Sequence, residues 1–517
     1  MRVLASILFL SCAVAGPARA EWREASSDHF VVVADDSEKD IRAFTDQLER
    51  YDAAMGRLFS NREEQPSPSN RVVIYVVNND GEVRKLLGDK SSRVAGFYIP
   101  RAGGSVAFVP RIENRSRELD ESMLILLHEY AHHFLISSSG FPMPLWMSEG
   151  AAEFFASAKF EKDGGVSLGR PAQHRAYELY NDGGIEVEDI LTATENEPDG
   201  SGFSAFYGKS WLLYHYLVFS EERAGQLKKY GTALRAGKTL REAAVEAFGN
   251  LDQLEKDLNS YLRQRRMSVF NMAGTNLQTG PIAVRPLSEG EAAMVPIKLQ
   301  SKRGVNREQA LEVLVDARKI AAKYPGEAAV QSALAEAEFD AGNDAEAIAA
   351  ANAALGIDDR QVNAYVQKGY ALFDEAESAD DREAAYAEAI KPFVALNKIE
   401  NNNPLPLLYF YRSFVEQGIE PSKLAVRGLG RAAQLAPFDL GLRFMLAMQD
   451  LRDGERDSAR ANLIPIAYDP HGGADADSAR AILVGLDKGT DTDTLIMQMA
   501  LGQVTDDRGN EGQSGGE

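Results

Sequence analysis

The chain has 517 residues, of which 44% are hydrophobic and 26% are charged, as in soluble globular proteins. A chain of this length is too long to fold around one ordinary hydrophobic core, so two or three domains are expected. The formal net charge of −21 argues against nucleic acid and anionic lipid surfaces as partners, because both would repel it.

The first 20 residues are predicted to be a signal peptide. A short basic start precedes an apolar stretch at residues 3–15, which is too short to span a bilayer, and Ala18-Arg19-Ala20 provides an A-x-A cleavage site. The only cysteine, Cys12, lies inside this segment, so the mature chain needs no disulfide. No other run of 18 apolar residues occurs, and no membrane span is expected. We therefore expect an exported protein, periplasmic or secreted.

The segment that follows predicts a small mixed sheet. Residues 29–33 and 71–77 are rich in β-branched and aromatic side chains and predict two strands, the second ended by a polar turn. Between them, residues 39–59 carry apolar side chains at helical spacing. Residues 94–99 and 105–109 flank a glycine-containing turn and predict a hairpin.

The next apolar segment, residues 123–135, contains the pattern H-E-x-x-H. On a helix, positions i and i+4 share one face, so His128 and His132 point the same way. Two imidazoles at this spacing can bind one Zn²⁺. Glu129, one step around the helix, can reach a metal-bound water without being a ligand itself.

A catalytic zinc needs a third protein ligand and an open position. A histidine at position 138 would supply it in one known pattern, but Ser138 stands there. Residues 137–142 predict a helix end and a loop, and a second helix from about Leu145 could present Glu149 to the same metal. Glu153, one turn further on, is placed to accept the second N–H of a liganding histidine.

The combination of H-E-x-x-H with W-x-x-E-G-x-A-E resembles the gluzincin zinc peptidases, in particular the peptidase MA-like group related to thermolysin and aminopeptidase N. The resemblance is tight over residues 123–155 and looser over about 25–265. It implies an α+β zincin-like catalytic domain, here residues 21–270, that holds one Zn²⁺ per chain. In this family pattern His128, His132 and Glu149 are the metal ligands, and Glu129 is the general base.

The resemblance also implies two further roles. Gluzincins place a tyrosine or histidine downstream of the third ligand to stabilise the oxyanion, and Tyr207 resembles that position, with His215 and His174 as weaker alternatives. The family's sheet has an edge strand beside the zinc that pairs with extended substrate. That role is assigned, as a hypothesis, to Ser105, Val106, Ala107, Phe108 and Val109.

The C-terminal half has a different pattern. Residues 271–305 lack a clear helix period and are interpreted as a connector with two short strands, whereas residues 306–502 are alanine-rich and helical. Turn residues there recur 33 to 45 positions apart, and small residues stand where paired helices approach closely. This resembles tetratricopeptide repeats, which form concave surfaces for peptides and proteins. Residues 503–517 are expected to be disordered. The repeat ends are marked by Pro325, Asp359, Pro404, Pro437 and Pro470.

Together these features predict an exported zinc metallopeptidase whose repeats recruit a peptide or protein substrate or a protein partner. The aminopeptidase signature Gly-Ala-Met-Glu-Asn has no counterpart, since residues 103–107 read Gly-Gly-Ser-Val-Ala, which favours endopeptidase action. The alternative is a non-catalytic periplasmic scaffold that acts through its repeats and keeps a vestigial zinc site. Glu129 argues against this alternative, because a purely structural zinc does not need a general base.

Overall fold

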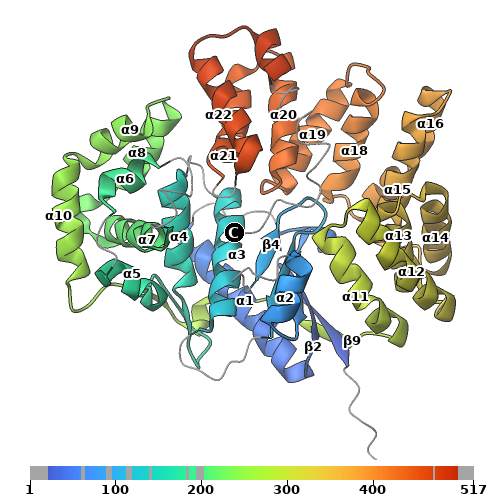
Figure 1. Cartoon of the computed structure of the whole chain (residues 1–517), viewed down its shortest axis with the longest axis horizontal. Coiled ribbons are helices and arrows are strands. Elements are labelled where there is room, and N and C mark those ends of the chain that lie inside the picture. Colours follow the sequence, from blue (N-terminus) through green and yellow to red (C-terminus); the bar gives the residue numbers. More distant parts are fainter. Residues whose placement is uncertain are drawn as a thin grey trace, which may run out of the picture.

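The computed structural model describes residues 21–59, 65–88, 96–111, 119–138, 143–181, 185–193, 203–469 and 472–498. The predicted signal peptide and the predicted tail lie outside these ranges. The described residues form a mixed α/β N-terminal region and a helical C-terminal region, and the C-terminal helices curve in an arc along one side of the sheet (Figure 1). Within the described ranges, no helix combines the length and apolar character that a membrane crossing requires.

A six-stranded mixed sheet forms the centre of the N-terminal region, in the order β4-β5-β3-β2-β1-β9. Strands β2, β3 and β5 are parallel, and the other neighbours pair antiparallel. Both predicted strands and the predicted hairpin are present. The strands are β1 (Trp22–Ser26), β2 (Phe30–Asp35), β3 (Val72–Val77), β4 (Phe97–Ile99), β5 (Val106–Pro110) and β9 (Ala283–Pro286).

The assignment of residues 105–109 to the edge strand is wrong. This segment forms β5, which pairs with β3 on one side and with β4 on the other, and the described edge of the sheet at that end is β4. All five residues of β5 are buried. A short run that is apolar throughout is typical of a strand enclosed by neighbours, because both of its faces meet core side chains.

Helices cover both faces of the sheet. One face packs against α1 (Glu38–Leu58) and α3 (Glu121–Ser138), and this core continues through α4 (Leu145–Ala156) to α7 (Phe203–Phe219). The other face packs against α2 (Asp80–Leu87) and α11 (Glu289–Arg303). Helix α2 begins within the polar turn predicted after the second strand, and the Asn79 side chain accepts the Glu82 N–H and so caps this helix.

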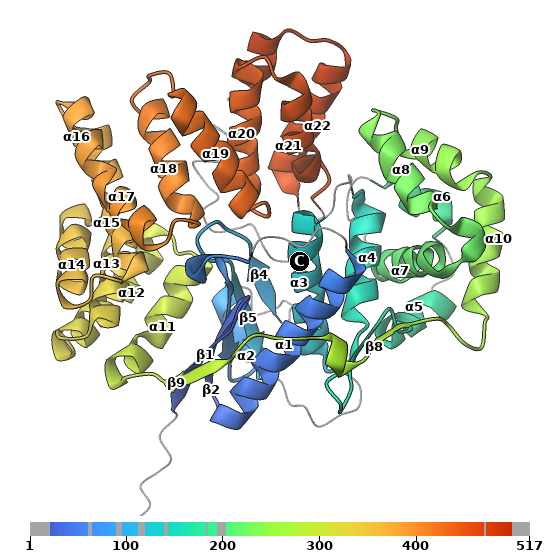
Figure 2. The same ribbon diagram turned by 180° about the vertical axis from the view of Figure 1, so that it is seen from behind.

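The segment at residues 271–305 is more than a connector. It contains two short strands, as expected, but β9 joins the main sheet beside β1, as Figure 2 shows from behind. Helix α11 follows, beginning at a capping box of Ser288 and Glu291 and continuing past Pro296. Helical periodicity was not evident there because α11 is buried against both the sheet and the next helices.

Shorter elements complete the N-terminal region beyond α4. A three-stranded sheet consists of β6 (Lys159–Phe160), β7 (Val166–Leu168) and β8 (Phe270–Met272). The remaining helices lie on the side of α3 and α4 away from the C-terminal arc (Figure 1). They are α5 (Ala176–Asn181), α6 (Val187–Thr192), α8 (Gln226–Arg235), α9 (Leu240–Phe248) and α10 (Leu251–Leu262).

The C-terminal region consists of successive packed helices. A helix begins at, or three residues after, each predicted repeat end, and left-handed glycines at 342, 418 and 454 separate the paired helices. The helices are α12 (Arg307–Lys323), α13 (Ala328–Asp340), α14 (Asp344–Ile357), α15 (Val362–Glu377), α16 (Arg382–Ala389), α17 (Lys391–Ile399), α18 (Pro404–Val415), α19 (Lys423–Leu435), α20 (Leu440–Arg452), α21 (Arg456–Ala467) and α22 (Gly473–Asp487).

The two regions are joined by specific contacts near β3 and β4. The Glu400 carboxylate accepts hydrogen bonds from the Ser69 N–H and hydroxyl at 2.9 and 2.8 Å. The Asp439 carboxylate accepts the Ala102 N–H at 2.8 Å. The turn between β4 and β5 also packs against α18, because a Cβ added at Gly103 would lie 2.5 Å from Leu405. The C-terminal helices are therefore packed against the N-terminal region through specific side-chain contacts.

Candidate metal centre

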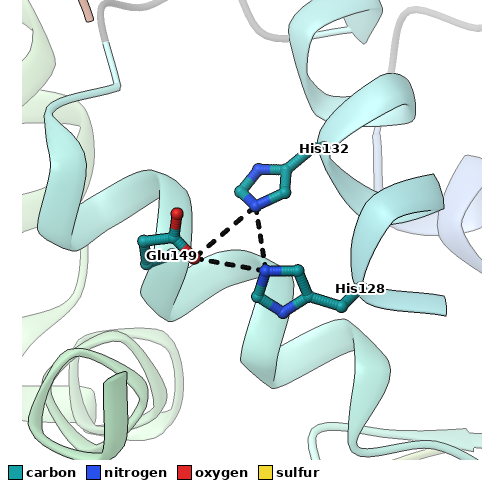
Figure 3. Close-up of side chains that lie close together, drawn as sticks. All are labelled: His128, His132 and Glu149. Atoms are coloured by element: carbon teal, nitrogen blue, oxygen red, sulfur yellow. Dashed lines mark hydrogen bonds and ion pairs between the residues drawn. The ribbon is translucent and has the colours of Figure 1, made fainter. Parts of the chain in front are cut away.

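Helices α3 and α4 bring three potential metal donors together at the place where they cross (Figure 3). The Nε2 atoms of His128 and His132 are 3.1 Å apart. Oε2 of Glu149 lies 3.2 Å from the first and 3.6 Å from the second. Helix α3 supplies the two imidazoles on one face, and the second helix supplies the carboxylate, in the arrangement that the sequence predicted.

This donor set is suited to a metal ion. Ligands about 2.0–2.1 Å from a tetrahedral zinc lie roughly 3.3 Å from one another, which is close to the three separations seen here. Glu149 is fully buried, and its Oε2 faces the two imidazole nitrogens. A buried carboxylate is costly unless a cation faces it. His128, His132 and Glu149 could therefore hold a divalent ion.

Packing of α4 fixes the position of Glu149. All twelve residues of α4 are buried, and the helix lies between α3 and α7. Gly150 permits the close approach to α7, because a Cβ at this position would lie 2.4 Å from the Ser210 carbonyl oxygen. The glycine next to the predicted third ligand thus has a steric role in placing the carboxylate.

Each imidazole is held through its other nitrogen. Nδ1 of His128 lies 3.5 Å from Oε1 of Glu153, and Nδ1 of His132 lies 3.2 Å from the Ser148 hydroxyl. Such partners fix the orientation and tautomer of a liganding histidine. The sequence suggested Glu153 for this role but gave no reason to select Ser148, whose position only the helix packing defines.

Glu153 also contacts a second histidine and an arginine. Nε2 of His174 is 2.6 Å from its Oε2, and Nη2 of Arg175 is 2.6 Å from its Oε1. Burial by itself would raise the pKa of Glu153, but bonds from His128 and His174 and the charge of Arg175 outweigh it and hold the pKa well below its usual range. His174, named as an alternative oxyanion donor, instead contacts this carboxylate.

His128 and Glu149 each stabilise the charged form of the other. Burial by itself would lower the pKa of His128, but contacts with Glu149 and Glu153 outweigh it and raise the pKa to about 10. Burial would raise the pKa of Glu149, but the two imidazoles outweigh it and keep the pKa well below its usual range. A cation at this position is therefore strongly favoured, whether it is a proton or a metal ion.

Tyr207 and Glu129 lie near the donors. The Tyr207 ring, from α7, is 6.2 Å from the His128 ring, centroid to centroid, and the Arg175 guanidinium is 5.0 Å from the Tyr207 ring centre. Burial, together with the charges of Glu149 and Glu129, raises the pKa of Tyr207, so its hydroxyl keeps its proton. Glu129 is half-buried on α3.

His215 does not belong to this group. It is fully buried on α7, with Nδ1 2.9 Å from the Tyr261 hydroxyl and Nε2 3.0 Å from the Gly169 carbonyl oxygen. Burial lowers its pKa to about 4. It is therefore a neutral core histidine, and the second alternative oxyanion donor is placed away from the metal donors.

A second group of potential metal donors was not identified from the sequence. His29, Glu49 and Asp52 each place one ligand atom within 4.8 Å of the others. The sequence did contain a sign of this group. In the helix predicted at residues 39–59, Glu49 and Asp52 stand next to the core positions Leu48 and Tyr51. Acids on the buried side of an amphipathic helix require a partner.

Comparison with models of known protein families gave no match, and neither did comparison with curated protein sequences. The functional interpretation of the chain therefore depends on its own residues. Two observations carry most weight: the meeting of His128, His132 and Glu149, and the placement of Glu129 and Tyr207 around them.

Proposed function

We propose that this protein is a zinc-dependent peptidase of the gluzincin type, with one catalytic Zn²⁺ held by His128, His132 and Glu149. The observation that carries the proposal is the convergence of these three donors at ligand separations, with Glu129 next to the first of them. A site that only held a structural ion would close the fourth position and would not need Glu129.

The surrounding residues have distinct roles in the proposed reaction. Zinc in such a site supplies Lewis acidity, which activates a water and polarises the scissile carbonyl. Glu129 accepts the proton of the attacking water and passes it to the leaving amine. The Tyr207 hydroxyl, kept protonated by its raised pKa, donates a hydrogen bond to the developing oxyanion. Glu153 and Ser148 hold the two imidazoles in place.

We assign the C-terminal helices to recruitment of a protein substrate or partner, in the manner of tetratricopeptide repeats. The supporting features are the paired helices, the glycine turns between them and the attachment of the arc beside β4. We further propose that the protein is exported, on the basis of the predicted signal peptide. The preference for endopeptidase action also remains part of the proposal.

Replacement of Glu129 by glutamine tests the proposed chemistry. The Glu129→Gln variant should retain one zinc per chain, measured by elemental mass spectrometry, and should lose cleavage of unfolded casein and of a mixed peptide library analysed by mass spectrometry. Glu121→Gln, an exposed acid at the start of the same helix, is the matched control and should remain active. Equal activity of Glu129→Gln and wild type would refute the scheme. Zinc binding by a wild type that cleaves nothing would favour the scaffold alternative.

A further inference from the structure

The second donor group lies behind α3, on the side away from His128 and His132. His29 immediately precedes β2, and Glu49 and Asp52 lie one turn apart on α1. Nδ1 of His29 is 2.8 Å from Oε2 of Glu49 and 3.5 Å from Oδ2 of Asp52. These separations are similar to those at the first centre, where the donor atoms are 3.1–3.6 Å apart.

One oxygen of each carboxylate accepts a hydrogen bond from a donor other than the His29 imidazole. Oε1 of Glu49 accepts the backbone N–H of His29 at 2.8 Å, and Oδ1 of Asp52 accepts the Tyr130 hydroxyl at 2.8 Å. The second oxygen of each group is the one that faces the His29 imidazole. Carboxylates that bind metal ions are commonly held in this way, with one oxygen fixed by a protein donor.

The charge of the group favours a divalent cation. Glu49 and Asp52 are 2% and 5% exposed, so both are removed from water. A protonated His29 would neutralise one carboxylate, whereas a divalent ion would balance both.

An internal cavity of about 80 Å³ adjoins the group. Its lining includes His29 and Asp52, together with Tyr130 and His133 from α3 and Phe438 from the helical region. The hydroxyl of Ser67, 1% exposed, also lines it and has no hydrogen-bond partner among the residues that the structure describes. A cavity of this volume with polar side chains in its lining can hold several water molecules, and one of them would supply the missing partner.

We propose that His29, Glu49 and Asp52 bind a second divalent first-row metal ion, with water from the adjoining cavity completing its coordination. One imidazole and two carboxylates suit Zn²⁺ or Mn²⁺. The ion joins the start of β2 to α1, and the hydrogen bond from Tyr130 to Asp52 extends this connection to α3. Its role is structural, and it does not depend on the peptidase proposal.

Metal counting in a background that lacks the first centre tests this site. Glu149→Ala protein is stripped with chelator and titrated with Mn²⁺, and bound ion is measured by electron paramagnetic resonance. We expect about one Mn²⁺ per chain, and about none after Glu49→Gln and Asp52→Asn are added. The control replaces Glu38 and Asp46, two solvent-accessible acids of the same helix, by their amides and should keep the ion.

A second measurement does not require the double variant to fold. Wild-type protein reconstituted with excess Zn²⁺ and then desalted should contain about two zinc ions per chain, and Glu149→Ala about one, by elemental mass spectrometry. One ion in wild type and none in Glu149→Ala would overturn the second site and leave the first intact. Mn²⁺ binding that is equal with and without Glu49 and Asp52 would also overturn it.

Discussion

The two faces of α3 differ in how their histidines are used. On one face His128 meets Glu149 and Glu153, and its pKa is raised to about 10 despite burial. On the other face His133 contacts the Tyr98 hydroxyl at 2.6 Å and the Phe438 ring, and burial lowers its pKa to about 3. Five positions along one helix thus separate a histidine with a raised pKa from one with a lowered pKa. The neighbouring elements decide the difference, since residue type and secondary structure are the same.

The largest effect on metal binding is expected from removing the Glu149 carboxylate, which faces His128 and His132 from α4. Glu149→Ala should lose the first metal, because two imidazoles alone do not complete a zinc site. The loss in zinc affinity should far exceed the roughly 10–100-fold typical of an outer-shell change. Competition with a chromophoric chelator measures the affinity, and Glu178→Gln, an acid that contacts Arg175, serves as the control. Unchanged affinity in Glu149→Ala would show that Glu149 is not a ligand.

A smaller effect on the same face is expected from Glu153→Gln. The amide cannot balance His174 and Arg175 and holds His128 less firmly. Zinc affinity should fall by about 10–100-fold, equivalent to about 1.4–2.7 kcal/mol. The same chelator competition measures it. A loss as large as that of Glu149→Ala would mean that Glu153 is itself a ligand, and no loss would remove it from the site.

The two faces also differ in how far the sequence could predict them. His128 and His132 share one helix, and Glu149 follows on the next. Spacing along the chain made the three residues candidates, and the family resemblance implied that they form one ligand set. The second group requires His29, from the start of a strand, to meet two acids of α1 and Tyr130 of α3. Such a meeting depends on tertiary packing, which periodicity does not encode.

The same distinction explains the results for the fold. The strands, the long helix and the starts of several C-terminal helices were predicted because each has a local period or turn signal. The edge position of β5 was predicted wrongly, because strand order depends on long-range pairing. Helix α11 was missed because its apolar positions face both the sheet and the following helices, which obscures a single amphipathic stripe.

His215 can test whether burial by itself keeps a histidine neutral, as burial does for His133 on the second face of α3. The His215 ring is buried and contacts a tyrosine hydroxyl and backbone carbonyl oxygens, and its pKa is lowered to about 4. Because the folded pKa lies below the unfolded value of about 6.5, stability is lost as pH falls through 6.5 towards 4. Between pH 7 and pH 5 this group should cost about 2 kcal/mol. Urea unfolding of wild type and His215→Asn at both pH values measures it, and equal pH dependence of the two would contradict the assignment.

The smallest expected effect concerns the hydrogen bond on the second face. Tyr98→Phe removes the hydroxyl that contacts His133 and should lower the free energy of unfolding by about 1 kcal/mol. Zinc at the first centre should be unchanged, because Tyr98 lies on β4 and bonds to the opposite face of α3. Tyr180→Phe, which removes an exposed hydroxyl 3.3 Å from a carbonyl oxygen, is the control and should cost less. Zinc loss in Tyr98→Phe would show instead that the two faces are coupled through the helix. His133 on the second face would then also help to position His128 and His132 on the first.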